Sequence, residues 1–310
     1  MLWPWQRAVL PDFPNVLRLR PPNGFGDHLM LSAVIEGIKA ERPELRIRVA
    51  ANHPELFLHN PHVEEALYEG RLKKRDPKLL ERYTRTYFRP PQERYLQLTG
   101  HLIDDMYARA GIELRDRPHQ PRIYLTDAEL KFRERQIEAL PRPRIAIVPF
   151  GKSSVRLPNK IYPADQWSAL TQLLGTLEGS RVHLGTRAEG PLAEGAVDLR
   201  DIGYRHMASV LRRCDLLITH VSGIMHLAAA VRTPALVLYG AAEHPAISGY
   251  PWNRNLYTPI ECGPCWMEEP CSHHSCMRGL TPQVVLAEVR DMLINLKAAE
   301  DHSAIETENA

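Results

Sequence analysis

Short apolar runs and amphipathic stretches alternate along the chain in two successive series. In the first series, the alternating segment Val16–Arg20 predicts a strand, apolar residues recur at helical spacing from Leu29 to Ile38, and Leu45–Ala51 predicts the next strand. The segment from Arg71 to Arg94 is rich in Arg, Lys and Pro and has little apolar pattern, so we expect a long excursion with some helix. A further amphipathic helix is predicted over His101–Ala110.

A second series follows a proline-rich break. Thr126 and Glu129 have the spacing of a capping box, which predicts a helix reaching to about Leu140, and Pro141 and Pro143 then interrupt the pattern. Beyond the break, the expected strands are Ile145–Val148, Arg181–Leu184, Leu216–Ile218 and Ala235–Tyr239, and the expected helices are Ala164–Leu177, Tyr204–Arg213, Ser222–Ala230 and Pro282–Ala298.

This alternation of strands and helices in both series predicts an α/β protein of two doubly wound, Rossmann-like domains that face a central cleft. We expect the first domain to span residues 1–142 and the second to span 143–298, with a cysteine-rich segment at 262–276 and a closing helix at its end. The polar tail, 299–310, is expected to be disordered.

Composition narrows the functional classes. Thirty-nine Lys and Arg residues against 37 Asp and Glu leave a net charge of +2, so no basic field indicates a nucleic-acid partner. No apolar run reaches the roughly 18 to 20 residues of a membrane span, and the first residues lack a signal-peptide pattern, so a cytoplasmic protein is expected. Trp3 and Trp5, with Arg7, could contact a membrane surface or a lipid-linked acceptor, or pack on the domain.

The first candidate site is the glycine turn Gly24-Phe25-Gly26-Asp27. Gly26 permits close backbone approach, and Asp27 begins the following helix at the edge where doubly wound sheets bind ligands. Asp27 could equally cap that helix and do nothing else. A dinucleotide fingerprint requires a third glycine where Leu29 stands, which disfavours a nicotinamide oxidoreductase.

A second candidate site opens the helix at Ser222. Ser222 and Gly223 leave backbone N–H groups and the positive end of the helix dipole available to a phosphate, and His226 follows one turn later. The alternative is an ordinary helix start with a packed histidine.

The third candidate site is the polar loop after Ile145–Val148, which carries Ser153 and Lys160. Gly151-Lys152-Ser153 resembles the end of a P-loop, but the earlier glycine is missing, which disfavours a kinase or NTPase. Glu189 follows the next strand and could accept hydrogen bonds from a ribose, although an exposed glutamate often has no such role.

Four cysteines form the last constellation. Cys262, Cys265, Cys271 and Cys276 lie within fifteen residues and begin with a Cys-x2-Cys spacing, which suits a tetrahedral zinc or iron site. Free or paired thiols are the alternative. We expect a structural metal rather than a catalytic one.

Taken together, these segments resemble glycosyltransferase family 9, the ADP-heptose transferases, over nearly the whole chain. The matching landmarks, in order, are Gly26-Asp27, Asn60-Pro61, Lys160-Ile-Tyr-Pro163, Gly185 to Glu189, Ser222-Gly-Ile-Met-His-Leu-Ala-Ala-Ala230, Thr233-Pro234 and the cysteine-rich end. The resemblance implies a GT-B fold, with an acceptor-binding N-terminal half and a donor-binding C-terminal half.

The resemblance also implies roles for these residues in an inverting transfer. Asp27 would be the general base, and Lys160 with the helix start at Ser222 and Gly223 would stabilise the departing diphosphate without a metal. The remaining expected binding residues are Gly26, Ser153, Glu189 at the ADP ribose and His226 at the phosphate or sugar. The implied donor is an ADP-sugar, a heptose, and the acceptor would be a hydroxyl or amine of a lipid-linked glycan, a protein or a small molecule.

The sequence departs from the family pattern at Val221, where members carry an Asp that touches the donor sugar. Valine cannot accept a hydroxyl hydrogen bond. Either a neighbour such as His220 supplies the contact, or the donor sugar differs. A catalytically altered member that acts as a metal-bearing scaffold is the alternative function. Some transferases resembling this family carry a four-cysteine iron site, but with wider spacing.

Overall fold

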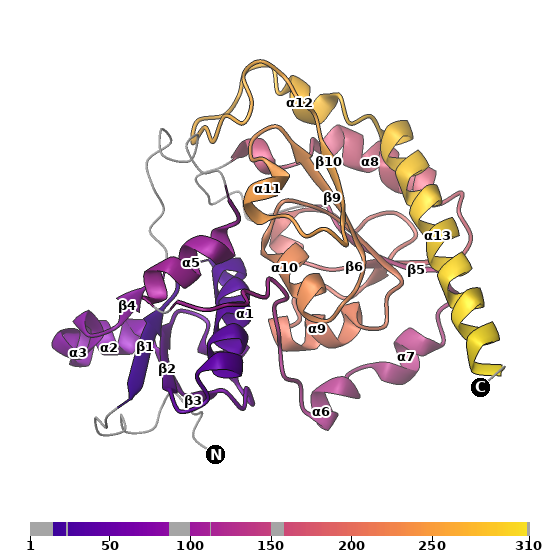
Figure 1. The fold of residues 1–310 in the computed structure, drawn as a ribbon. Coiled ribbons are helices and arrows are strands. Elements are labelled where there is room, and N and C mark those ends of the chain that lie inside the picture. The colour runs from indigo at the N-terminus through magenta and orange to yellow at the C-terminus, as the bar shows by residue number, and fades with distance from the viewer. Residues whose placement is uncertain (1–14, 23, 87–99, 112, 150–157, 309–310) are drawn as a thin grey trace.

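The computed structural model describes residues 15–22, 24–86, 100–111, 113–149 and 158–308, with side chains described to residue 298. It consists of two α/β halves, each built on a parallel sheet (Figure 1). The first sheet has the strand order β3-β2-β1-β4. Its strands are β1 (Val16–Arg20), β2 (Arg46–Ala51), β3 (Val63–Tyr68) and β4 (Thr84–Arg85).

The second sheet is wider and has the strand order β10-β9-β8-β5-β6-β7. All of its neighbouring strands pair in parallel. Its strands are β5 (Arg144–Val148), β6 (Ser180–His183), β7 (Val197–Asp198), β8 (Leu216–His220), β9 (Ala235–Gly240) and β10 (Arg254–Tyr257). The two sheets confirm the predicted doubly wound α/β architecture.

Each sheet reverses its strand order at one point. In the first sheet, successive strands run from β1 towards β3, and β4 returns to the other side of β1. In the second sheet, β5 to β7 run one way, and β8 to β10 run the other way from β5. The connections leaving such a switch point diverge, which opens a crevice at the carboxyl ends of the strands. The turn after β1 and the turn after β8 both leave a switch point.

The helices cover the faces of the two sheets. Those of the first half are α1 (Phe25–Glu41), α2 (Glu69–Arg75), α3 (Pro77–Glu81) and α5 (Leu102–Ala110). Two short helices, α6 (Asp127–Leu130) and α7 (Glu134–Glu138), lead to the second half. The others are α8 (Ala164–Leu174), α9 (Tyr204–Leu211), α10 (Gly223–Ala230), α11 (Pro245–Ser248), α12 (Ser275–Arg278) and α13 (Pro282–Glu308), and the 3-10 turns include η2 (Pro54–Phe57), η3 (Pro158–Lys160) and η4 (Arg187–Glu189).

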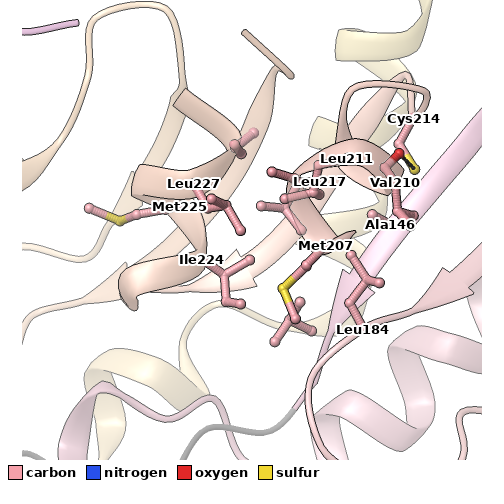
Figure 2. Packing of buried hydrophobic residues seen from close by; sticks show 14 of the residues in the cluster. Ala146, Leu184, Met207, Val210, Leu211, Cys214, Leu217, Ile224, Met225 and Leu227 are labelled. Atoms are coloured by element: carbon pink, nitrogen blue, oxygen red, sulfur yellow. Dashed lines mark hydrogen bonds between the residues drawn. The ribbon is translucent and has the colours of Figure 1, made fainter. Parts of the chain in front are cut away.

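The core of the second half lies on both faces of its sheet. Figure 2 shows the α9 and α10 face, where Met207 and Leu211 of α9 lie beside Ile224 and Leu227 of α10. The opposite face is covered by α8, α12 and α13. Since the strands are apolar on both faces, they appear in the sequence as continuous apolar runs rather than as alternating ones.

The two halves share part of one core. Helix α1 packs along α10, and the apolar cluster of the first half includes Ala229, Ile247, Tyr250 and Trp266 from the second half. Eleven of the 17 residues of α1 are buried, because α1 shares an apolar cluster with strands of its own sheet and also contacts α5 and α10. This contact fixes where the turn before α1 lies relative to the turn before α10.

The structure differs from the sequence prediction in two helices. The helix expected from Thr126 to Leu140 is divided into α6 and α7, because Arg133 between them has a left-handed backbone with φ of 49°. Helix α13 extends to Glu308, so the tail from residue 299, expected to be disordered, is helical as far as that residue.

The second sheet begins at Arg144, next to the domain boundary expected at residue 142. The chain nevertheless already packs on the second half from Ile123 onwards. Within the described ranges, no helix combines the length and apolarity needed to cross a bilayer. Trp3, Trp5 and Arg7 lie outside the described residues.

Candidate active site

The turns that begin α1 and α10 lie against each other. A Cβ atom added at Gly26 would lie 2.8 Å from Cδ2 of His226 and 3.0 Å from Cα of Gly223. Only glycine permits so close an approach, and the group that approaches Gly26 here is the opposite turn. The structure therefore brings together two candidate sites that are about two hundred residues apart in the sequence.

Asp27 lies in the first turn of α1. Its Oδ2 atom accepts a hydrogen bond from the backbone N–H of Gly24 at 3.1 Å, so the carboxylate does cap its own helix. A carboxylate has about four acceptor sites, and this bond occupies one of them. The capping bond therefore orients Asp27 and is compatible with a second role as a proton acceptor.

The neighbouring His28 fixes the geometry of this turn. Its ring is fully buried, its Nε2 accepts from the backbone N–H groups of Asn52 at 3.1 Å and His53 at 3.2 Å, and its Nδ1 is 2.8 Å from the carbonyl oxygen of Gly24. Two N–H donors at Nε2 require the proton to be on Nδ1. Burial lowers the pKa of His28 to about 3, so the ring is neutral. No pattern in the sequence indicated this role of His28.

The start of α10, unlike that of α1, has no acidic residue in its first turn. Ser222 is the N-cap residue, and its side chain makes no capping hydrogen bond; its Oγ is 3.4 Å from Oγ1 of Thr219. The Phe25 ring covers Gly223, because a Cβ added at Gly223 would lie 2.4 Å from Cε1 of that ring. Phe25 in turn stacks on Tyr204, with ring centroids 4.3 Å apart. The backbone N–H groups at this helix start therefore have no side-chain cap, and they lie next to the stacked rings of Phe25 and Tyr204.

Two buried histidines flank the start of α10. His226 Nδ1 is 2.7 Å from the Tyr250 hydroxyl, and burial, together with His101 and Lys160, lowers the pKa of His226 to about 3. His220 is 2% exposed, and burial and Lys160 lower its pKa to about 4. Nδ1 of His220 has no hydrogen-bond partner in the part of the chain that the structure describes. Both rings are therefore neutral.

Lys160, at the end of η3, is held by two groups of the second half. Its ammonium forms an ion pair with Glu243, and it lies 5.0 Å from the centroid of the Trp266 ring. Glu243 is 2% exposed and also accepts a hydrogen bond from Ser248. An ammonium group has three donors, so an anion can bind beside Glu243. The positive charge of Lys160 contributes to lowering the pKa values of His220 and His226.

The other expected residues are less central. Glu189 ends η4, and its Oε2 atom accepts from the backbone N–H of Thr186 at 3.4 Å and packs against Gly185, at the carboxyl edge of the second sheet. Val221 is 7% exposed and belongs to the apolar cluster of α9 and α10. Ser153 lies outside the described residues.

The four cysteines line one pocket of about 200 Å³ together with Asn159 and the backbone after β9. Cys262 is exposed and Cys276 is buried, and burial raises the pKa of the Cys276 thiol. Across the described ranges, no group of three or more His, Cys, Asp or Glu side chains is arranged to hold a metal ion. The expected metal site therefore receives no support from the positions of these thiols.

Known proteins share this architecture. Escherichia coli ADP-heptose LPS heptosyltransferase II superposes with a TM-score of 0.65 at 21% identity, over 91% of this chain and 99% of that protein. The dodecameric, iron-containing heptosyltransferase TibC of enterotoxigenic E. coli, in complex with ADP-D-β-D-heptose, superposes with a TM-score of 0.66 at 17% identity, over 91% of this chain and 76% of that one. Two parallel-sheet halves in this arrangement define the GT-B fold.

The family follows from the sequence. The family model for glycosyltransferase family 9 (heptosyltransferase) matches residues 68–275. The chain belongs to this family of transferases. The match includes Lys160, Glu189 and the start of α10, whereas Asp27 lies before it.

A curated relative, lipooligosaccharide heptosyltransferase 2 of Campylobacter jejuni, is 34% identical over 87 residues, which are 26% of this chain and 27% of that protein. The chain thus matches about a quarter of the length of this relative.

Proposed function

We propose that this protein is an inverting glycosyltransferase that moves a heptose from an ADP-sugar to a hydroxyl or amine of an acceptor. The observation that carries the proposal is the contact between the two switch-point turns, one bearing a carboxylate and the other an uncapped helix start whose His226 has a pKa lowered in part by the charge of Lys160. A base on one side and anion-binding groups on the other are the two requirements of the reaction.

In the proposed reaction, the acceptor oxygen or nitrogen forms a bond to the anomeric carbon of the donor as the bond to the ADP oxygen breaks. Asp27 accepts the proton of the attacking group. Negative charge develops on the diphosphate, where the Lys160 ammonium and the backbone donors of Ser222 and Gly223 stabilise it. These groups are fixed before the reaction, which lowers the barrier because they need little reorganisation.

Further residues would define the donor subsite. Glu189, at the carboxyl edge of the second sheet, has the position and chemistry to accept hydrogen bonds from the ribose of ADP. His226 would contact the phosphate or sugar, and His220, whose Nδ1 lacks a partner among the described residues, would provide the sugar contact that Val221 cannot make. Names of relatives favour an ADP-heptose donor and a lipooligosaccharide-type, lipid-linked acceptor.

A test of this function is a screen of ADP- and UDP-sugars, in the presence of candidate acceptors, for released nucleotide. We expect release of ADP from ADP-heptose above that from UDP-sugars. Binding without nucleotide release would favour the alternative, in which an altered family member acts as a scaffold. Faster turnover of another nucleotide sugar would change the donor and leave the reaction class intact.

We propose separately that the four cysteines bind a structural zinc or iron ion. Four thiols around one pocket have the donor chemistry of such a site, and TibC is described as iron-containing. The thiols would have to converge from the positions seen here. Elemental analysis of untagged protein should find close to one metal per chain; absence of metal with four titratable thiols in this segment would refute the proposal.

A further inference from the structure

The cysteine-rich segment, residues 262–276, is hydrogen-bonded to Asn159, the residue that precedes Lys160. Asn159 is 4% exposed, and its side-chain Oδ1 accepts from the backbone N–H of Cys271 at 2.7 Å. Its Nδ2 donates to the carbonyl oxygens of Glu269 at 2.9 Å and Met267 at 3.4 Å. The backbone carbonyl of Asn159 is 2.9 Å from Nε2 of His274. One buried residue thus bonds to four positions of the segment.

The same segment also touches Lys160 itself. The Trp266 ring lies under the ammonium at 5.0 Å. The backbone N–H groups of Cys265 and Trp266 donate to the carbonyl oxygens of Ala241 at 3.2 Å and Ala242 at 3.0 Å, directly before Glu243. The segment is therefore attached on one side to η3 and on the other to the loop whose carboxylate pairs with Lys160.

We propose that Asn159 is a positioning residue that fixes the Lys160 ammonium between Glu243 and Trp266 by fastening η3 to the cysteine-rich segment. Lysine has a flexible side chain with several rotatable bonds, and its affinity for an anion depends on how much of this freedom is already restricted. Asn159 restricts the backbone one residue away, and Trp266 and Glu243 restrict the ammonium. The segment is then part of the donor site, in addition to the structural metal role expected from the sequence.

A purely structural role is the competing explanation, because a buried and fully bonded asparagine also stabilises the fold. The two roles predict different coupling. If Asn159 acts through Lys160, its removal matters for ADP only while Lys160 is present. If it only supports the fold, its effect is the same with or without Lys160.

The test is a double-mutant cycle on ADP affinity, measured by calorimetry in the full chain with wild type, Asn159→Ala, Lys160→Ala and the double variant. We expect Asn159→Ala to weaken ADP binding by about tenfold in the wild-type background and by less than about twofold in the Lys160→Ala background. Asn159→Asp, which keeps the Oδ1 acceptor and loses the Nδ2 donors, is the second variant if the alanine protein does not fold.

A matched control is Thr233→Val. Thr233 is 3% exposed, and its Oγ1 donates to the carbonyl oxygen of Leu211 at 2.7 Å, at the opposite edge of the second sheet. Like Asn159→Ala, Thr233→Val removes a buried hydrogen bond from a side chain to the backbone. The unfolding temperature of this variant should therefore fall, while its ADP affinity stays within about twofold of wild type.

Because the proposal depends on the proposed phosphate role of Lys160, the cycle separates the two failures. If Lys160→Ala leaves ADP affinity unchanged, the role of Lys160 is wrong. If Lys160→Ala weakens binding and Asn159→Ala does not, or if the effect of Asn159→Ala is equal in both backgrounds, the positioning role alone is overturned.

Discussion

The turn before α1 and the turn before α10 connect a strand to a helix in the same way, but only the first carries an acidic side chain at its helix start. Each leaves a switch-point strand, passes a glycine and begins a helix with a buried, neutral histidine in it. The first turn carries Asp27, which caps its own helix, and the second has no side-chain cap and lies near Lys160. In the proposed function, this one local architecture would supply a proton acceptor at the first turn and an anion-binding site at the second, depending on one acidic side chain.

The difference arises from which residue satisfies the helix start. At α1, a carboxylate inside the first turn compensates the dipole and meets a backbone N–H, so a second anion there is disfavoured. At α10, Ser222 leaves the N–H groups without a side-chain partner, and an anion is favoured. The following predictions test this contrast.

The largest effect is expected for Asp27→Asn. Asparagine keeps an oxygen that can accept from the N–H of Gly24, yet it cannot accept a proton, so turnover of ADP-heptose should fall by about 10²- to 10⁴-fold. The measurement is the rate of ADP release with acceptor present. Asp76→Ala is the control, because Asp76 accepts from Leu79 N at 3.0 Å and caps α3, and its removal should leave turnover unchanged. Normal turnover of Asp27→Asn would show that capping is its only role.

Gly26→Ala should disrupt the contact between the turns. The new methyl group would lie 2.8 Å from the His226 ring and 3.0 Å from the Gly223 backbone, so we expect a loss of about 1 to 3 kcal/mol in the free energy of unfolding, with reduced turnover. Gly203→Ala, where a Cβ has no neighbour within 4 Å, is the control for chemical denaturation and should change stability by less than about 0.5 kcal/mol. Equal effects of both substitutions would contradict the close apposition.

The buried, neutral histidines predict that the folded protein loses stability in acid. His28 and His226 each have a folded pKa of about 3, below the ordinary histidine pKa of about 6.5, so the unfolded chain binds more protons between these values. Stability should therefore fall as pH drops from about 6.5 towards 3, by up to about 1.4 kcal/mol per pH unit for each histidine, and should not depend on them above that window.

Denaturant titrations at pH 7, 6 and 5 measure this slope. His28→Gln should reduce this slope by the contribution of one histidine. A slope that does not change in His28→Gln would contradict the neutral, buried state of that ring.

A smaller effect is expected at His220. If its Nδ1 contacts the donor sugar, His220→Ala should lower the ratio of ADP-heptose turnover to that of another ADP-sugar by about five- to thirtyfold, with ADP affinity little changed. The ratio is read from released ADP. An unchanged ratio would remove His220 from the sugar contact and leave Val221 uncompensated.

Much of the fold could be predicted from the sequence because buried parallel strands appear as apolar runs. Strand β3 (Val63–Tyr68) was not recognised, since Glu64 and Glu65 interrupt its pattern; Glu64 pairs with the buried Arg48 of the neighbouring strand. The division between α6 and α7 depends on a left-handed Arg133, for which the sequence carries no glycine signal. Such features depend on tertiary contacts, which override local propensity.

The candidate site divides in the same way. Asp27 and the Ser222 helix start could be predicted because glycine turns after strands have a local signature. The contacts of Glu243 and Asn159 could not be predicted, because the partners lie 83 positions apart for Glu243 and Lys160 and 112 for Asn159 and Cys271. The only feature of Asn159 visible in the sequence is its place next to Lys160.

The most direct test of the opposite roles of the two turns is ADP binding by calorimetry in wild type, Lys160→Ala and Asp27→Asn, measured side by side. The account predicts that Lys160→Ala weakens ADP binding by about tenfold or more, through the lost charge-assisted contact, and that Asp27→Asn stays within about threefold of wild type. Unchanged affinity in Lys160→Ala, or an equal loss in Asp27→Asn, would contradict it.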